Sequence, residues 1–403
     1  MCLHWLKFGN ASANTLTFFD EFYQSFESKI ESKEKMLFFL YTIIFALFLN
    51  EYNAAPGVKK LFRSVEKSGL SKGKSTENLN VDDLKFANFP ITFACVTDEE
   101  LIGFHKVVVN DSVIPSTLLE RLDNGRGLSL FFHGAINHVT TKYGLMYHFA
   151  KEWFTESGSN ICIVSYNFDM EPVSGCNPAL VAQHDEAIKR LGYVAKLGRD
   201  LITGIQDTCW DSEDGGKCLN IHEVDIIGFN FGAHVAAQTC EFLKQKMNQK
   251  VRMLLALDPS RTAPIMIEPK VAIKKGIAHY VQVIHTTVEG RNGEVFEKSG
   301  DVDIYLKYKP GQPLTDGLDF YVHMATATKR LYMLASEKGS GTIIKRRGRQ
   351  PFPEPKSNEC VVGVYSALNP KKTGKRYVIS VANRIGMLKT ELGSYAESTI
   401  LFE

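Results

Sequence analysis

The stretch from Val224 to Ala237 reads VDIIGFNFGAHVAA and decides the fold of this chain. Its first residues form a short apolar run rich in β-branched side chains, which favours a buried β-strand. Gly228 and Gly232 frame a tight turn, and from about Ala233 the residues follow a helical pattern. Because glycine lacks a β-carbon, this spacing lets strand and helix approach closely while the residue between them is pushed outward in a strained conformation.

Asn230 occupies the centre of this turn. In hydrolases built on such an elbow, that residue is a serine whose hydroxyl attacks an acyl carbon after a histidine has taken its proton. A carboxamide nitrogen is a weak nucleophile and is not usefully deprotonated near neutral pH. Asn230 therefore predicts an elbow that has kept its architecture and lost its acyl-transfer chemistry. Asparagine also tolerates a positive φ better than most residues, so the bend can persist.

Short apolar runs alternate with helical patterns on both sides of this elbow. The runs are ITFACV, LSLFFHG, NICIVSYNF, VRMLLALDPS and YVQVIHT, and a long helical pattern covers about 179–205. Apolar strands separated by amphipathic helices predict a mostly parallel sheet with helices on both faces, the doubly wound α/β class. Ligands of such sheets gather where the strands end, at His133, Asn230, Asp258 and His285 in this chain.

Four motifs occur in a fixed order along the chain: LFFHG, IIGFNFGAHVA, ALDPS and VIHT. Together they resemble the neutral, pancreatic-type lipase family of the α/β-hydrolase fold over about residues 83–385. The resemblance implies a lipase-like α/β-hydrolase domain, which we place at 84–403. It also implies that Asn230 stands where the family has its serine.

The resemblance assigns roles to four further residues. Asp258 is expected to be the acid of the former catalytic triad, and His323, in FYVHMATATKR, is expected to be its base. Ala135 and Phe231 are expected to supply the backbone N–H donors of an oxyanion hole. Neither a cofactor nor a metal is expected at this remnant site, and the eight cysteines form no CxxC pair of the kind that binds structural zinc.

Several departures from the family pattern indicate that the lipase activity has been lost. Asp301 replaces a histidine that precedes the base in the family, and Tyr321 replaces a cysteine that helps to hold a long lid. Only a short loop fits between Gln312 and His323. In these losses the chain is similar to the insect yolk proteins, secreted members of the family that lack the serine. We therefore expect a secreted, catalytically inactive yolk-like storage protein or lipid carrier, and the sequon at Asn110 agrees with a glycoprotein.

Two other functions stay open from the sequence. An active carboxylic-ester hydrolase of lipid catabolism, a triacylglycerol lipase or phospholipase A1, would need another nucleophile, and Ser165 and Ser260 lie near predicted strand ends. A module that binds a glycan or a receptor would use a basic run at 345–349, although most such runs are solvated loops. That run contains Lys345, Arg346, Arg347 and Arg349. The formal net charge of only +2 predicts no general attraction to nucleic acid.

Several polar residues also have structural interpretations. Asp258 precedes a proline and suits a turn cap, and His285 in VIHT is expected to be a hydrogen-bonded core histidine. Cys209 and Cys218 flank a polar loop whose length allows a disulfide. Cys162 lies within the apolar ICIVSY and is expected to be a buried free thiol.

The N-terminal segment predicts secretion. Leu37–Leu49, LFFLYTIIFALFL, follows two lysines and precedes small residues, as in a signal peptide. The run is shorter than the roughly 20 residues that cross a bilayer, so we expect no stable membrane span. We expect a leader over 1–54, in which 36–54 is the signal peptide and 1–35 an upstream gene-model extension. A polar arm, 55–83, follows.

Overall fold

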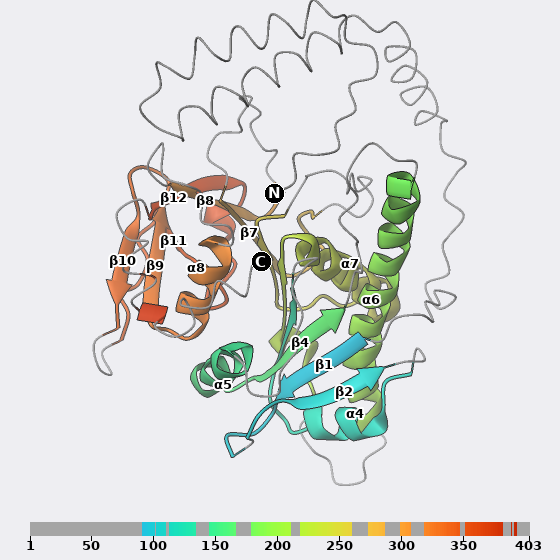
Figure 1. Ribbon diagram of the computed structural model, residues 1–403. Coiled ribbons are helices and arrows are strands. Elements are labelled where there is room, and N and C mark those ends of the chain that lie inside the picture. Colours follow the sequence, from blue (N-terminus) through green and yellow to red (C-terminus); the bar gives the residue numbers. More distant parts are fainter. Residues whose placement is uncertain are drawn as a thin grey trace, which may run out of the picture. The chain divides into compact units, whose positions relative to one another are not determined.

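A mixed β-sheet forms the centre of the computed structural model (Figure 1). Its strands lie in the order β10-β9-β12-β8-β7-β6-β5-β3-β4-β1-β2, and β11 pairs with β9 beside this path. The structure describes residues 91–100, 102–109, 113–133, 145–166, 179–210, 218–259, 273–286, 299–307, 318–346, 351–381, 388 and 391–392. The predicted leader, the polar arm and the sequon at Asn110 lie outside these residues.

The elements have the following bounds. The strands are β1 (Ile91–Val96), β2 (His105–Val109), β3 (Leu128–Phe132), β4 (Asn160–Tyr166), β5 (Val224–Phe229), β6 (Met253–Leu257), β7 (Tyr280–His285), β8 (Val302–Lys307), β9 (Leu331–Ser336), β10 (Thr342–Lys345), β11 (Glu359–Val361) and β12 (Lys375–Ser380). The α-helices are α4 (Ser116–Leu122), α5 (Leu145–Ser157), α6 (Ala179–Trp210), α7 (Phe231–Met247) and α8 (Leu318–Ala327), and short 3-10 turns occur at η2 (Ile221–Glu223) and η4 (Pro370–Lys372).

The central strands are parallel. Parallel pairing runs from β4 through β3, β5, β6, β7 and β8 to β12. At one edge β1 pairs antiparallel with β4 and β2 with β1, and at the other β9, β10 and β11 pair antiparallel. The predicted class, a mostly parallel α/β sheet with helices on both faces, is confirmed. Because parallel strands end at one edge, His133, Asn230, Asp258 and Thr286 follow neighbouring strands there.

Helices cover both faces of this sheet. On β3, Leu128, Leu130 and Phe132 join an apolar cluster with α4, α6 and α7, whereas Phe131 joins a second cluster with α5 and α8. This division follows from the alternation of side chains along a strand. The alternating apolar side chains of the strands therefore bind one layer of helices on each face of the sheet.

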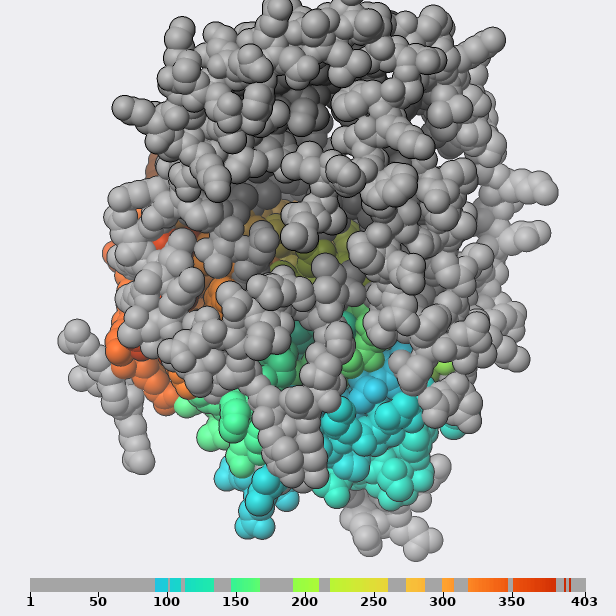
Figure 2. Space-filling model, in the orientation of Figure 1, coloured from blue at the N-terminus to red at the C-terminus, as the bar shows by residue number. Residues whose placement is uncertain are grey.

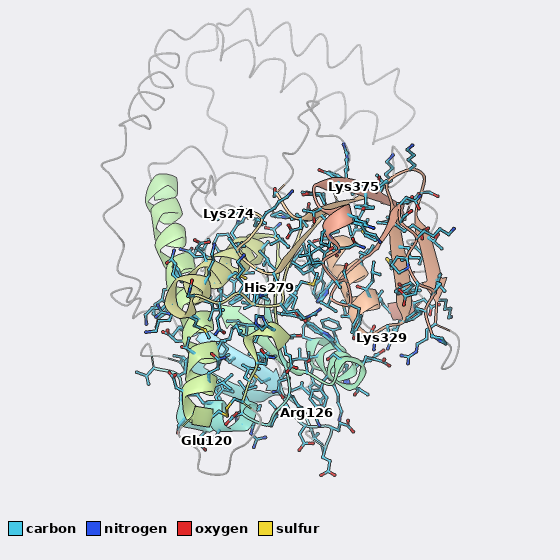
Figure 3. All side chains as sticks on the ribbon, turned by 180° about the vertical axis from the view of Figure 1, so that it is seen from behind. Glu120, Arg126, Lys274, His279, Lys329 and Lys375 are labelled. Carbon is cyan, nitrogen blue, oxygen red and sulfur yellow. A yellow bond between two sulfur atoms is a disulfide. The ribbon has the colours of Figure 1, made fainter. Side chains whose placement is uncertain are left out.

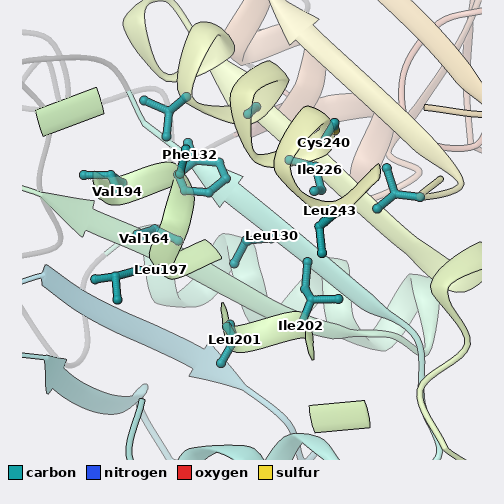
Figure 4. Packing of buried hydrophobic residues seen from close by; sticks show 14 of the residues in the cluster. Leu130, Phe132, Val164, Val194, Leu197, Leu201, Ile202, Ile226, Cys240 and Leu243 are labelled. Carbon is teal, nitrogen blue, oxygen red and sulfur yellow. The ribbon is translucent and has the colours of Figure 1, made fainter. Parts of the chain in front are cut away.

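The first cluster holds α7, and with it the elbow, against the sheet. Figure 4 shows this packing, with side chains of β3, β4, β5, α6 and α7 in one apolar group. The labelled members are Leu130, Phe132, Val164, Val194, Leu197, Leu201, Ile202, Ile226, Cys240 and Leu243. Each fully buried aliphatic or phenyl side chain stabilises the fold by about 1.5–3 kcal/mol relative to an exposed one.

The outer end of α8 is held to α5 by polar contacts. Lys329, which follows α8 (Figure 3), donates a hydrogen bond of 2.8 Å to the carbonyl oxygen of Glu156 near the end of α5. Arg330 binds both carboxylate oxygens of Glu152 at 2.7 and 2.6 Å. A two-pronged contact of this kind is geometrically specific, so it sets the position of α8 relative to α5.

A disulfide between Cys95 and Cys162 joins β1 to β4, where the two residues are direct partners in the ladder. The edge formed by β1 and β2 appears in blue and cyan at the surface of the molecule (Figure 2). The prediction that Cys162 is a free thiol is wrong, because its partner is 67 residues away and no local spacing reveals it. The predicted bridge between Cys209 and Cys218 is confirmed.

Candidate functional site

Asn230 lies at a strained bend between β5 and α7. Its backbone angles are φ 52° and ψ −115°, a combination outside the left-handed helical region in which asparagine is common. Such a conformation costs about 1–3 kcal/mol and persists only where the surrounding structure imposes it. The predicted elbow is therefore present, with its helix beginning at Phe231 rather than near Ala233.

At both glycines of the elbow, neighbouring backbone atoms leave no space for a β-carbon. A β-carbon at Gly228 would lie 2.2 Å from the carbonyl oxygen of Gly232. A β-carbon at Gly232 would lie 2.2 Å from the carbonyl oxygen of Phe132 and 2.3 Å from that of His133. Because backbone atoms cannot move aside as a flexible side chain can, α7 reaches this position over β3 only with glycine at both sites.

Asp258 follows β6 directly and lies beside the end of β7. Its carboxylate accepts hydrogen bonds from the hydroxyl of Thr286 at 2.5 Å and from the backbone N–H of the same residue at 3.3 Å. Its own backbone N–H donates to Ile284 at 2.7 Å. Like Asn230, Asp258 is partly exposed. Thr286 thus supplies two hydrogen bonds to the Asp258 carboxylate.

The structure does not bring His323 to Asp258. The imidazole is fully buried in α8, stacked on Phe131 at 5.7 Å and edge-on to Phe149 and Trp153 at 5.7 and 5.0 Å. Among the described residues, neither ring nitrogen has a hydrogen-bond partner. Burial lowers the pKa of His323 to about 3, so the ring is neutral at physiological pH. In this position it can neither take a proton from a nucleophile nor be oriented by Asp258.

Asp319 lies one helical turn before His323, near the start of α8. Its side chain is fully buried, and neither carboxyl oxygen has a hydrogen-bond partner among the described residues. Burial raises the pKa of Asp319 well above its usual range, and the charge of Asp258 raises it further. The backbone N–H groups of Asp319 and Phe320 oppose this shift only in part.

Sequence reasoning missed Asp319. The available signal was an aspartate four residues before His323. Residues four apart lie on the same face of a helix, so an error of one turn in register exchanges one residue for the other.

His285 is a buried structural histidine, as predicted. Its Nε2 lies 3.0 Å from a carboxylate oxygen of Asp303 on β8, and its ring stacks on Tyr305 at 4.6 Å. The guanidinium of Arg376 lies 3.9 Å from the centre of the Tyr305 ring. These contacts join β7, β8 and β12 beside the site.

Other predicted residues lie elsewhere or outside the described part of the chain. Phe231 is the first residue of α7 and is buried. Ser165 is buried within β4, opposite Thr92 in the ladder, and is not on an elbow. Ala135 and Ser260 lie outside the described residues.

The described part of the basic run pairs with acidic side chains. Lys345, the last residue of β10, forms an ion pair with Glu391 at 2.6 Å, and Arg346 forms one with Glu156. Both pairs reduce the positive charge that a glycan would meet. The remainder of the run, Arg347 and Arg349, lies outside the described residues, and the glycan contact stays a prediction.

None of the described helices combines the length and apolar character needed to cross a membrane. Within the same described ranges, no three histidine, cysteine or carboxylate side chains gather where they could hold a metal ion. The apolar run 37–49 lies outside these ranges.

Residues 219–318 match the family model described as Lipase. The matched stretch contains Asn230 and Asp258 and ends one residue before Asp319. The match supports the lipase family for this part of the chain and is consistent with the elbow described above.

Solved esterases are also similar to this chain. An esterase of Pyrobaculum calidifontis matches with a TM-score of 0.20 and 12% identity, over 33% of this chain and 36% of that one. A bacterial heroin esterase matches with a TM-score of 0.24 and 12% identity, over 51% and 52%. The esterase Est22 matches with a TM-score of 0.27 and 15% identity, over 50% and 63%. This chain therefore spans about a third to two thirds of these structures.

Proposed function

We propose that this chain is a secreted, lipase-like protein that binds lipid without hydrolysing it, as a storage or carrier protein does. The observation that carries the proposal is the content of the elbow site. Asn230 holds the strained position between β5 and α7, the described partner of the Asp258 carboxylate is Thr286, and the imidazole of His323 is buried without a described hydrogen-bond partner. Two of the three groups that acyl transfer needs are therefore replaced.

Each replacement acts on a different step. Without a hydroxyl or thiol at residue 230, no covalent acyl intermediate can form there. Among the described residues, no imidazole is hydrogen-bonded to Asp258, so none of them is placed to accept a proton from a nucleophile and pass it to the leaving alcohol. Loss of a triad member leaves only the roughly 10³–10⁴-fold rate enhancement that binding and the oxyanion hole provide.

The two described disulfides support the proposal of secretion. Disulfides form and persist in oxidising compartments, and one of them closes a loop of 67 residues within the sheet. The similarity to insect yolk proteins belongs to the same proposal.

Turnover measurements test the enzymatic half of this proposal. The purified protein and an Asn230→Ala variant are incubated with p-nitrophenyl butyrate, p-nitrophenyl palmitate and a phosphatidylcholine. We expect identical rates for both proteins, at the level of buffer. A rate that falls in the Asn230→Ala variant would refute the inactive assignment and favour an esterase.

Binding measurements test the other half. The intrinsic fluorescence of a polyene lipid rises when it leaves water for an apolar site, and saturable binding at about one lipid per chain is expected. Absence of saturable binding would leave storage without a lipid cargo as the remaining function.

A further inference from the structure

A pocket of about 810 Å³ opens at the opposite end of the sheet from the elbow. Its wall includes Asn124 and Arg126, which precede β3, and Asn124 is hydrogen-bonded to Asn160, the first residue of β4. Asn230, by contrast, follows the last residue of β5, a parallel neighbour of β3. The volume is typical of a site for a small molecule. The pocket therefore belongs to a different part of the molecule from the elbow.

A pair of side-chain amides fixes the wall of this pocket. Asn160 is fully buried, and its amide nitrogen donates a hydrogen bond of 3.0 Å to the side-chain oxygen of Asn124. The amide nitrogen of Asn124 donates in return to the side-chain oxygen of Asn160 at 2.9 Å. Asn160 also donates to the carbonyl oxygen of Leu122, the last residue of α4, at 3.2 Å. These bonds hold the end of α4 and the turn after it in one position.

Charged side chains of both signs line the pocket. Glu120 and Arg121 come from α4, and Asp98 comes from the segment after β1. Arg126 comes from the turn before β3, and Figure 3 shows it with Glu120 in the lower part of the view. The guanidinium of Arg126 lies 5.0 Å from the centre of the Phe154 ring, and this contact orients it.

These four charged groups stay separate from one another. Among the described residues, none of them has an ion-pair partner. Four other arginines do pair with carboxylates: Arg199 with Asp200, Arg252 with Asp225, Arg330 with Glu152 and Arg346 with Glu156. Two guanidinium groups and two carboxylates that share one pocket without pairing leave space between opposite charges, which a ligand can enter.

The balance of charge selects the class of ligand. Two positive and two negative groups line the pocket, so a simple anion or a simple cation is attracted by one pair and repelled by the other. A zwitterion gains at both ends. Guanidinium groups bind a phosphate or carboxylate through two parallel hydrogen bonds, and carboxylates accept hydrogen bonds from a primary ammonium group.

A quaternary ammonium group fits this pocket poorly. It has no N–H to donate, and proteins recognise it through the faces of aromatic rings. The described residues that line the pocket include no aromatic side chain. The lining therefore favours a primary ammonium group over its trimethylated form.

We propose that this pocket binds a small zwitterion that carries a primary ammonium group together with a phosphate or a carboxylate. Arg121 and Arg126 bind the anionic group, and Asp98 and Glu120 accept hydrogen bonds from the ammonium group. This chemistry occurs in the ethanolamine head group of phospholipids and in free amino acids. Because the pocket lies apart from Asn230, the proposal does not depend on lipid binding at the elbow.

Isothermal titration calorimetry of the full chain tests the proposal with two primary ammonium compounds, glycerophosphoethanolamine and 5-aminopentanoate. Each is compared with its trimethylated counterpart, which for the first is glycerophosphocholine. We expect the primary ammonium compound that binds to exceed its counterpart at least about tenfold in affinity, which corresponds to about 1.4 kcal/mol. Equally tight binding of the trimethylated form would overturn the proposal. Inorganic phosphate that binds as tightly as either compound would also overturn it.

The same titrations identify the source of the ligand. Tighter binding of glycerophosphoethanolamine supports the proposal with a phospholipid head group as the ligand. Tighter binding of 5-aminopentanoate supports it with an amino acid as the ligand. If neither compound binds, the proposal fails.

Substitutions on the exposed face of α4 sharpen the test, with folding verified by circular dichroism. Arg121→Gln and Glu120→Gln are each expected to weaken binding of the zwitterion about tenfold, because each removes one charge-assisted contact. Glu354→Gln is the matched control, since this carboxylate is exposed and does not line the pocket, and its affinity should stay within about twofold. Asn230→Ala should also bind as the wild type does. Unchanged affinity in both α4 variants would overturn the proposal.

Discussion

The backbone N–H of Asn230 donates a hydrogen bond of 2.8 Å to the carbonyl oxygen of Leu257, the last residue of β6. This bond ties the strained elbow to the strand that leads directly into Asp258. The spacing between Asn230 and Asp258 is thus set by the sheet itself.

The first prediction is that Asn230→Ser alone does not produce an esterase. We expect the serine hydroxyl to have no base, because His323 is fully buried and neither of its ring nitrogens has a hydrogen-bond partner among the described residues. We expect hydrolysis of p-nitrophenyl butyrate at the level of the wild type. The double variant Asn230→Ser/Asp319→His is expected to exceed the single one by about 10²-fold or more, the usual contribution of a general base.

Asn230→Ala/Asp319→His is the control for this series, since it has the base without the nucleophile. Clear activity in the Asn230→Ser single variant would mean that another residue supplies the base.

The second prediction concerns the elbow glycines. Gly232→Ala is expected to lower the free energy of unfolding by about 3 kcal/mol or more, because the new methyl group meets two backbone carbonyl oxygens. Urea denaturation measures this change. Gly204→Ala in α6 is the matched helical control: its methyl group meets only the flexible end of Leu119, so a change within about 1 kcal/mol is expected.

The third prediction concerns acid stability and His323. Its pKa of about 3 in the folded state lies below the ordinary value of 6.5. As the pH falls, His323 therefore takes up a proton in the unfolded chain before it does so in the folded chain. The titration of His323 therefore leaves the free energy of unfolding unchanged above pH 6.5 and lowers it as the pH falls toward 3. His323→Leu removes this contribution, and its unfolding free energy should decline less between these two pH values. At neutral pH we expect it to be unchanged or higher by about 1 kcal/mol.

His285→Leu is the contrasting variant. It leaves the buried carboxylate of Asp303 without its ring partner, so a loss of about 2–3 kcal/mol at neutral pH is expected. If His323→Leu destabilised the protein to the same extent at neutral pH, a hidden polar partner of His323 would have to exist.

The fourth prediction separates the two disulfides. Replacing both Cys95 and Cys162 by serine opens a loop of 67 residues, and chain entropy predicts a loss of about 4 kcal/mol. The same replacement of Cys209 and Cys218 opens a loop of 9 residues, for which about 2.5 kcal/mol is expected. Thermal unfolding followed by circular dichroism compares the variants, and an equal or reversed order would contradict the entropic account.

Local features of the sequence were enough to predict the elbow and the class of fold. The glycine spacing at Gly228 and Gly232 and the apolar run before it specify a strand, a bend and a helix, because steric limits on the backbone act between near neighbours. Alternating apolar strands and helical patterns predicted the parallel sheet for the same reason. Asn230 could be placed at the bend from its position between the glycines alone.

Only the tertiary structure decided which residues meet across the sheet. Asp258 and Thr286 lie 28 positions apart, and Cys95 and Cys162 lie 67 apart. Such pairs depend on strand order, and the neighbours of α8 depend on the exact turn at which it begins, because one helical turn exchanges Asp319 for His323. Periodicity repeats from turn to turn and cannot distinguish these registers, whereas the packing of α8 against β3 and α5 admits a single one.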